Sequence, residues 1–115
     1  MDSKELTRII YNALDDKKGE SIKILDISKV SVIADYFVIV SGNNINQVQA
    51  LADNVKEELY KLGFEPRNVE GYHAASWILL DYTDVIVHIF SKDDRLFYDL
   101  ERIWRDGREI EVSQL

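Results

Sequence analysis

The sequence contains no cysteine, a single proline and no long hydrophobic run. Without cysteine the chain can form no disulfide bond, no thiolate zinc site and no cysteine nucleophile. Its apolar runs fall short of the roughly 18 consecutive residues that a membrane-spanning helix requires. The first residues also lack the basic stretch and apolar core of a signal peptide. We therefore expect an untargeted, cytoplasmic protein.

Clusters of positive charge are absent as well, and the formal net charge is -7. Between residues 24 and 55 the only positive side chain is Lys29, and between 65 and 90 it is Arg67. Binding to nucleic-acid phosphates needs clustered Lys and Arg. The acidic middle of the chain favours a basic protein partner over a nucleic acid, although acidity by itself also serves solubility.

What the chain has is apolar content: 46% of its 115 residues are hydrophobic, spread along its whole length. That is enough for one core, and no repeat or linker divides the sequence, so residues 1–115 are predicted to form a single domain. Asp2 is expected to cap a first helix, with Gly19 in a left-handed position at its end. Asn44 is expected to cap a second, with Gln47 at its third position and Gly63 ending it.

A third helix is predicted after Ser91, with its apolar face formed by Leu96, Phe97, Leu100, Ile103 and Trp104. Strands are predicted at residues 22–26, 36–40, 64–70, 77–80 and 85–90, with a loop at 27–34. Only residues 81–84 separate the last two strands, so they should form an antiparallel hairpin. The fold class is α+β: a mixed five-stranded sheet with an antiparallel C-terminal hairpin, flanked by three helices.

Candidate catalytic residues are few. The histidines are His73, in a loop, and His88, within an apolar strand where a hydrogen-bonded structural histidine is the expected role. Ser41 and the following glycine lack a nucleophile-elbow pattern, a P-loop lysine and a Rossmann fingerprint. We therefore expect no cofactor and no metal. The remaining alternative is a divergent metal-dependent nucleotidyl transferase using Asp81 and Asp84, although charged turn residues explain that pair as well.

Several segments together resemble the ribosomal silencing factor family, also called the Iojap-like family: residues 35–42 (DYFVIVSG), 47–53 (QVQALAD), 77–90 (WILLDYTDVIVHIF) and 95–101 (RLFYDLE). The resemblance implies a nucleotidyltransferase-like fold without the catalytic motif, and no enzymatic activity. It also implies a translational repressor that binds the large ribosomal subunit through ribosomal protein fourteen and blocks joining of the small subunit. Free members are commonly homodimers. One departure from the family pattern is Thr83, where a glycine is often found.

The resemblance also implies the partner-binding residues, which are Glu70, Trp77, Leu79, Asp81 and Tyr82. Trp77, Leu79 and Asp81 alternate along one predicted strand and so should share one face of the sheet. Asp81 and Tyr82 fall at the predicted hairpin tip, where a side chain can be lost without opening a cavity. We expect this pair to serve recognition and not folding, although the turn position leaves Tyr82 as open to burial as to exposure.

Overall fold

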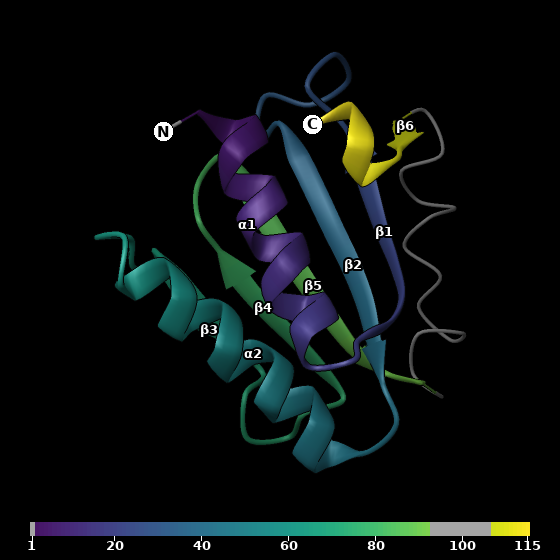
Figure 1. Ribbon diagram of the computed structural model, residues 1–115, viewed down its shortest axis with the longest axis vertical. Coiled ribbons are helices and arrows are strands. Elements are labelled where there is room, and N and C mark those ends of the chain that lie inside the picture. The colour runs from purple at the N-terminus through teal and green to yellow at the C-terminus, as the bar shows by residue number, and fades with distance from the viewer. Residues whose placement is uncertain (1, 93–106) are drawn as a thin grey trace.

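The computed structural model describes residues 2–92 and 107–115 (Figure 1). Its described part is a six-stranded sheet in the order β3-β4-β5-β2-β1-β6, with two α-helices, α1 and α2. No described helix is long and apolar enough to cross a membrane. The elements are α1 (Ser3–Asp16), β1 (Glu20–Asp26), β2 (Tyr36–Gly42), α2 (Ile45–Tyr60), β3 (Asn68–Glu70), β4 (Trp77–Asp81), β5 (Val85–Ser91), β6 (Arg108–Ile110) and the 3-10 turn η1 (Val112–Gln114).

The sheet is mixed, as predicted, because β2 and β5 pair in parallel at its centre while all other neighbours are antiparallel. The hairpin of β4 and β5 is confirmed. The predicted number of five strands is wrong, because β6 adds a sixth by pairing with β1, Ile110 opposite Ile24. Three residues at an edge carry no readable alternation, so this strand depends on its tertiary partner.

One predicted strand is much shorter than expected. The strand predicted at 64–70 shortens to β3, since Pro66 has no backbone N–H to donate to a ladder. The region 27–34 is a loop, as predicted. The predicted third helix falls largely on residues 93–106, outside the described residues. Its prediction, like that of a nucleotidyltransferase-like fold, stays open.

Both described helices begin where the sequence predicts. The Asp2 carboxylate accepts a hydrogen bond from the backbone N–H of Glu5 at 2.8 Å, and the Asn44 side chain accepts one from Gln47 at 2.8 Å. The Gln47 side chain in turn accepts a bond from the Asn43 N–H at 2.6 Å. These bonds satisfy N–H groups that a helix start leaves without an intrahelical partner.

The glycine prediction is confirmed at one helix end and wrong at the other. Gly63 has φ +88 and follows α2, as expected. After α1, however, Lys18 takes the left-handed conformation with φ 60, and Gly19 does not. Gly19 serves a close approach instead, because a Cβ there would lie 2.6 Å from the Val40 side chain.

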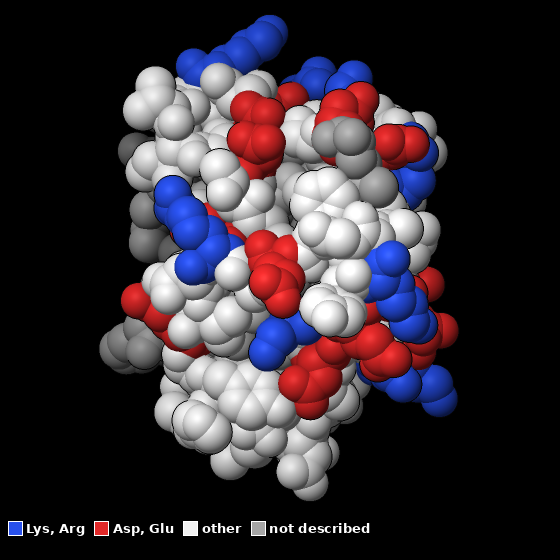
Figure 2. Space-filling view, turned by 90° about the vertical axis from the view of Figure 1, so that its left-hand side faces the viewer, with Lys and Arg blue, Asp and Glu red and all other residues white. Residues whose placement is uncertain are grey.

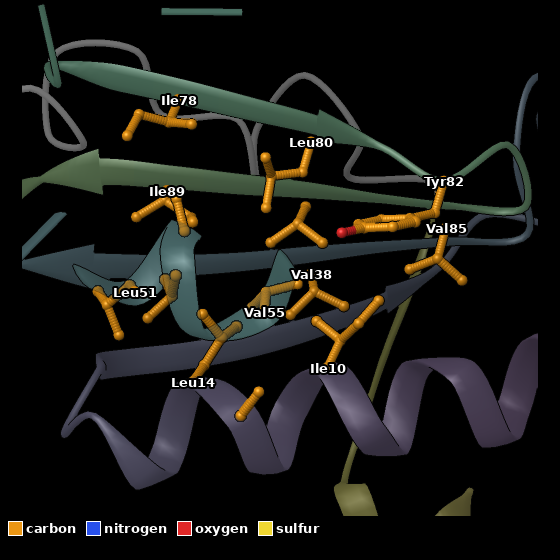
Figure 3. Packing of buried hydrophobic residues seen from close by; sticks show 14 of the residues in the cluster. Ile10, Leu14, Val38, Leu51, Val55, Ile78, Leu80, Tyr82, Val85 and Ile89 are labelled. Carbon is orange, nitrogen blue, oxygen red and sulfur yellow. The ribbon is translucent and has the colours of Figure 1, made fainter. Parts of the chain in front are cut away.

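Both described helices lie on one face of the sheet (Figure 1). Alternate residues of the central strands, such as Val38, Leu80 and Ile89, point toward these helices and form the larger hydrophobic cluster with them (Figure 3). The intervening residues build a second, smaller cluster on the other face, which comprises Leu25, Ile27, Ala34, Phe37, Ile39, Ile86 and Phe90. The period of two thus gives the strands two apolar sides, which is why they read as continuous hydrophobic runs.

Candidate partner-binding face

The second face of the sheet brings together most of the predicted partner-binding residues. Trp77, Leu79 and Asp81 alternate along β4 and share this face. Glu70 of β3 lies directly opposite Leu79 in the antiparallel ladder, so its side chain joins them. Glu70 is exposed, Trp77 and Leu79 are partly exposed, and Asp81 is buried. We call Glu70, Trp77 and Leu79 the β4 face.

Aromatic side chains support this face from below. The ring of Trp77 stacks on Phe90 with 5.2 Å between centroids and 25° between planes. The Trp77 Nε1–H donates a hydrogen bond to Nδ1 of His88 at 3.1 Å. Phe37 meets the edge of the His88 ring at a centroid distance of 4.6 Å. Trp77 is therefore held in one orientation by a stack and a directed bond, which keeps its exposed edge in place.

His88 is a structural histidine, as predicted. Only 4% of its surface is exposed, and burial lowers its pKa to about 4, so the ring is neutral near pH 7. Because Nδ1 accepts the bond from Trp77, the proton of the neutral ring sits on Nε2. That Nε2–H is buried and has no hydrogen-bond partner in the described part of the chain. A buried donor without a partner lowers the stability of the folded protein.

Asp81 is tied into the hairpin by both carboxylate oxygens. Oδ2 forms an ion pair with the Arg67 guanidinium at 2.6 Å, and Oδ1 accepts a bond from the Thr83 N–H at 2.8 Å. The Asp81 carbonyl also accepts the backbone N–H of Arg67 at 2.7 Å. The expectation that its side chain is dispensable for folding is therefore wrong.

Tyr82 lies on the opposite face of the sheet, inside the helix-covered core. It is 6% exposed and sits among Leu80, Val38 and Val85, with its hydroxyl pointing into the cluster (Figure 3). Burial raises the pKa of that hydroxyl to about 12, and no described residue offers it a hydrogen bond. Of the two positions left open for Tyr82, the structure shows burial. Its loss would open a cavity, which contradicts the expectation that it acts outside folding.

The signal for Tyr82 was present in the sequence. Ile78 and Leu80 point into the core, and Tyr82 continues their alternation by one more step beyond the last residue of β4. The prediction that residues 81–84 all belong to the turn ends this alternation one residue too early. The turn proper is shorter, because the Tyr82 N–H donates to the Val85 carbonyl at 3.0 Å.

The remaining candidates for chemistry do not converge on one another. His73 is exposed and meets the edge of the Tyr72 ring at 5.5 Å, while Ser41 is buried within β2. Asp84 is exposed, and its carbonyl accepts bonds from Asp35 and Tyr36. Among the described residues no group of three or more His, Asp or Glu side chains is placed to hold a metal ion.

Fold and face together define a class: a small α+β protein whose sheet presents a partly exposed tryptophan held by buried aromatic rings. Comparison with known proteins identifies the family within this class. Residues 1–115 match the family described as "Ribosomal silencing factor during starvation". Proteins named "Ribosomal silencing factor RsfS" are similar: that of Halalkalibacterium halodurans is 43% identical over 113 residues (98% of this chain, 97% of the relative), and that of Bacillus subtilis is 42% identical over 107 residues (93% and 91%).

A solved structure agrees. The crystal structure of a protein from Chromobacterium violaceum matches with a TM-score of 0.89 at 32% identity, covering 96% of this chain and 92% of that one. The chain therefore belongs to the ribosomal silencing factor family, and the resemblance noted in the sequence is confirmed.

Proposed function

We propose that this protein binds the large ribosomal subunit and represses translation by blocking the joining of the small subunit. Membership of the ribosomal silencing factor family supports a ribosome-associated regulator of translation. The observation that carries the finer proposal is the β4 face, where Trp77 and Leu79 are partly exposed and Glu70 is exposed. Ordered aromatic and aliphatic side chains beside a charge are the residues on which protein interfaces depend most.

The proposed partner is ribosomal protein fourteen of the large subunit, met by the β4 face in the cytoplasm, without catalysis and without a cofactor. Asp81 and Tyr82 act indirectly in this proposal, because one braces the hairpin and the other fills the core beneath it. When the protein is free of ribosomes, we propose that it forms a homodimer.

Charge contributes locally and not as a uniformly acidic surface. Figure 2 shows the side of the molecule that carries α2 and β3, where acidic and basic side chains are intermixed and the lower end bears neither. On the β4 face, Arg67 already neutralises Asp81, whereas no described ion pair involves Glu70. Glu70 is therefore the carboxylate available to meet a basic partner there.

The test is cosedimentation with purified bacterial large subunits, together with a subunit-joining assay. We expect the wild-type protein to sediment with large subunits and to prevent added small subunits from joining them. Glu70→Lys should weaken retention by tenfold or more, because it sets a positive charge against a basic surface. Its matched control is Glu57→Lys, which makes the same charge change at an exposed position on α2.

Three results would contradict the proposal. One is a wild-type protein that does not bind large subunits. Another is a Glu57→Lys variant that loses binding as strongly as Glu70→Lys. The third is turnover of nucleoside triphosphates in the presence of Mg²⁺, which would favour the transferase alternative.

A further inference from the structure

The loop between β1 and β2 carries an unusual concentration of exposed apolar side chains. Val30 is 48% exposed, Val32 is 105% exposed and Ile33 is 62% exposed. We call these three residues the apolar tip. Single exposed apolar residues are ordinary, but three within four positions of a loop form a patch of the kind that marks interaction sites.

The loop is held in shape by its own hydrogen bonds. The Ile27 N–H donates to the Asp35 carbonyl at 2.9 Å, which closes the base, and the Val30 N–H donates to the Ile27 carbonyl at 3.1 Å. The Ile33 N–H donates to the Ser31 hydroxyl at 3.0 Å. Ile27 and Ala34 at the base are buried, at 0% and 6% exposure. The apolar tip is thus displayed on an ordered support, which lowers the entropy cost of binding.

The base of this loop is continuous with the β4 face. Ile27 and Ala34 belong to the same buried cluster as Phe37, and Trp77 and Leu79 pack against that cluster. The loop, seen at the top of Figure 1, is also joined to the turn after β4, because the Asp35 N–H donates to the Asp84 carbonyl at 2.8 Å. One partner surface could therefore cover the β4 face and reach the apolar tip.

We propose that the apolar tip is a second anchor, which inserts into an apolar recess with a basic rim on a protein of the large ribosomal subunit. This rests on the proposed function and extends its contact surface. The flanking charges fit a basic rim: Asp26, Asp35 and Asp84 lie beside the loop against Lys29 and Arg108, and Arg108 already forms an ion pair with Asp26 at 3.8 Å. An RNA partner fits poorly because carboxylates outnumber the basic side chains that the described residues place beside the tip, and an anionic membrane fits poorly with a net charge of -7.

The experiment compares two double variants in equilibrium binding to purified bacterial large subunits. Val32→Ser with Ile33→Ser removes the outer part of the apolar tip, and exposed positions leave the fold intact. The matched control is Ile45→Ser with Leu62→Ser, which removes two other exposed side chains, at 55% and 49% exposure, one at the first residue of α2 and one in the turn after it. We expect the tip variant to bind at least tenfold more weakly and the control to stay within twofold of wild type.

The outcomes separate this inference from the proposed function. If wild type fails to bind large subunits, the proposed function itself is wrong and the anchor falls with it. If wild type binds and the tip variant binds equally well, only the anchor is overturned. Sedimentation velocity then measures self-association of wild type and of the tip variant. If the tip variant no longer self-associates but keeps its affinity for large subunits, the tip contacts a second copy of this chain and the proposal is overturned. A circular dichroism melt must show both variants folded, and a tenfold loss in the folded tip variant alone supports the anchor.

Discussion

Trp77 and His88 are joined across β4 and β5 by a hydrogen bond of 3.1 Å from the indole Nε1–H to Nδ1 of the imidazole. The bond fixes the orientation of the aromatic ring on the β4 face and the tautomer of the buried histidine beneath it. It leaves the second nitrogen of His88 without a described partner. A surface residue and a core residue therefore depend on one another, and their variants should not act independently.

Trp77→Phe should lower the free energy of unfolding by about 1–3 kcal/mol, because it leaves Nδ1 of the buried His88 unsatisfied. His88→Leu should lower it by less, because it removes the bond from the indole N–H but also removes the unpartnered Nε2–H. The double variant removes both polar atoms at once. Its loss should fall short of the sum of the single losses by about 1 kcal/mol, as expected for contacting residues. Urea unfolding of the four proteins measures this, and strictly additive losses would show that the bond contributes nothing.

Acid should destabilise the protein through His88. In the unfolded chain this histidine titrates near 6.5, while in the folded protein burial lowers its pKa to about 4. Between those two pH values the histidine is protonated in the unfolded state and neutral in the folded state. The free energy of unfolding is therefore highest above about pH 6.5 and declines as the pH falls toward 4. The loss amounts to about 3 kcal/mol across that window. In His88→Leu this component should be missing, which urea unfolding at pH 7, 5.5 and 4 would show.

Tyr82→Phe should stabilise the protein by about 1 kcal/mol. The change removes a buried hydroxyl for which the described residues provide no partner, and it keeps the ring that fills the core. Tyr60→Phe, at 68% exposure, is the control and should leave the unfolding free energy unchanged. A destabilised Tyr82→Phe would mean that the hydroxyl does find a hydrogen bond in the folded protein.

Thr83→Gly should raise the free energy of unfolding by up to about 1 kcal/mol. Thr83 has φ 74, a left-handed conformation that costs a β-branched residue roughly 1–2 kcal/mol and glycine almost nothing. Part of that gain is offset by the greater freedom of glycine in the unfolded chain. Thr83→Ala keeps a Cβ and should give little of the gain, so equal melting temperatures for the two variants would rule out backbone strain as the cause.

Association with large subunits should weaken as salt rises, because Glu70 and the carboxylates beside the apolar tip are exposed to screening over roughly 8–10 Å. We expect affinity to fall on the order of tenfold between low salt and several hundred millimolar salt. Glu70→Gln should reduce the slope of this dependence. An affinity that stays flat would assign binding to apolar contact alone.

Much of the fold can be predicted from the sequence, because the signals for helix starts and for the hairpin lie in neighbouring residues. The helix starts at Asp2 and Asn44 follow from side chains that can cap, and the hairpin follows from two apolar runs with a short gap. β6 could not be predicted from the sequence, because it forms by long-range pairing with β1 and its three residues carry no local strand signal. The role of Gly19 could not be predicted either. A side chain is excluded there only because Val40 packs against Gly19 in the folded protein.

The candidate site also has features that local signals predict and features that depend on long-range contacts. Alternation correctly predicted that Trp77, Leu79 and Asp81 share a face, and the ladder adds Glu70 to them. The role of Asp81 could not be read from the sequence, because it depends on the pairing of β3 with β4, which brings Arg67 beside Asp81. The expectation that Tyr82 serves recognition and not folding is contradicted by its burial in the core. Emptying the core at Tyr82 alone costs about 3–5 kcal/mol.

The short strands at the two borders of the sheet set how the molecule can meet others. β3 and β6 have three residues each, and they cover the longer strands β4 and β1. Too few backbone groups face outward at either border to template another extended chain, so fibre-like stacking and strand-donating ligands are both disfavoured. Recognition must then proceed through side chains on the broad face and the loops. Removing residues 108–115 would take the β6 partner from Ile24, Leu25 and Asp26 and leave β1, a strand of seven residues, as an open edge to which another extended chain could add.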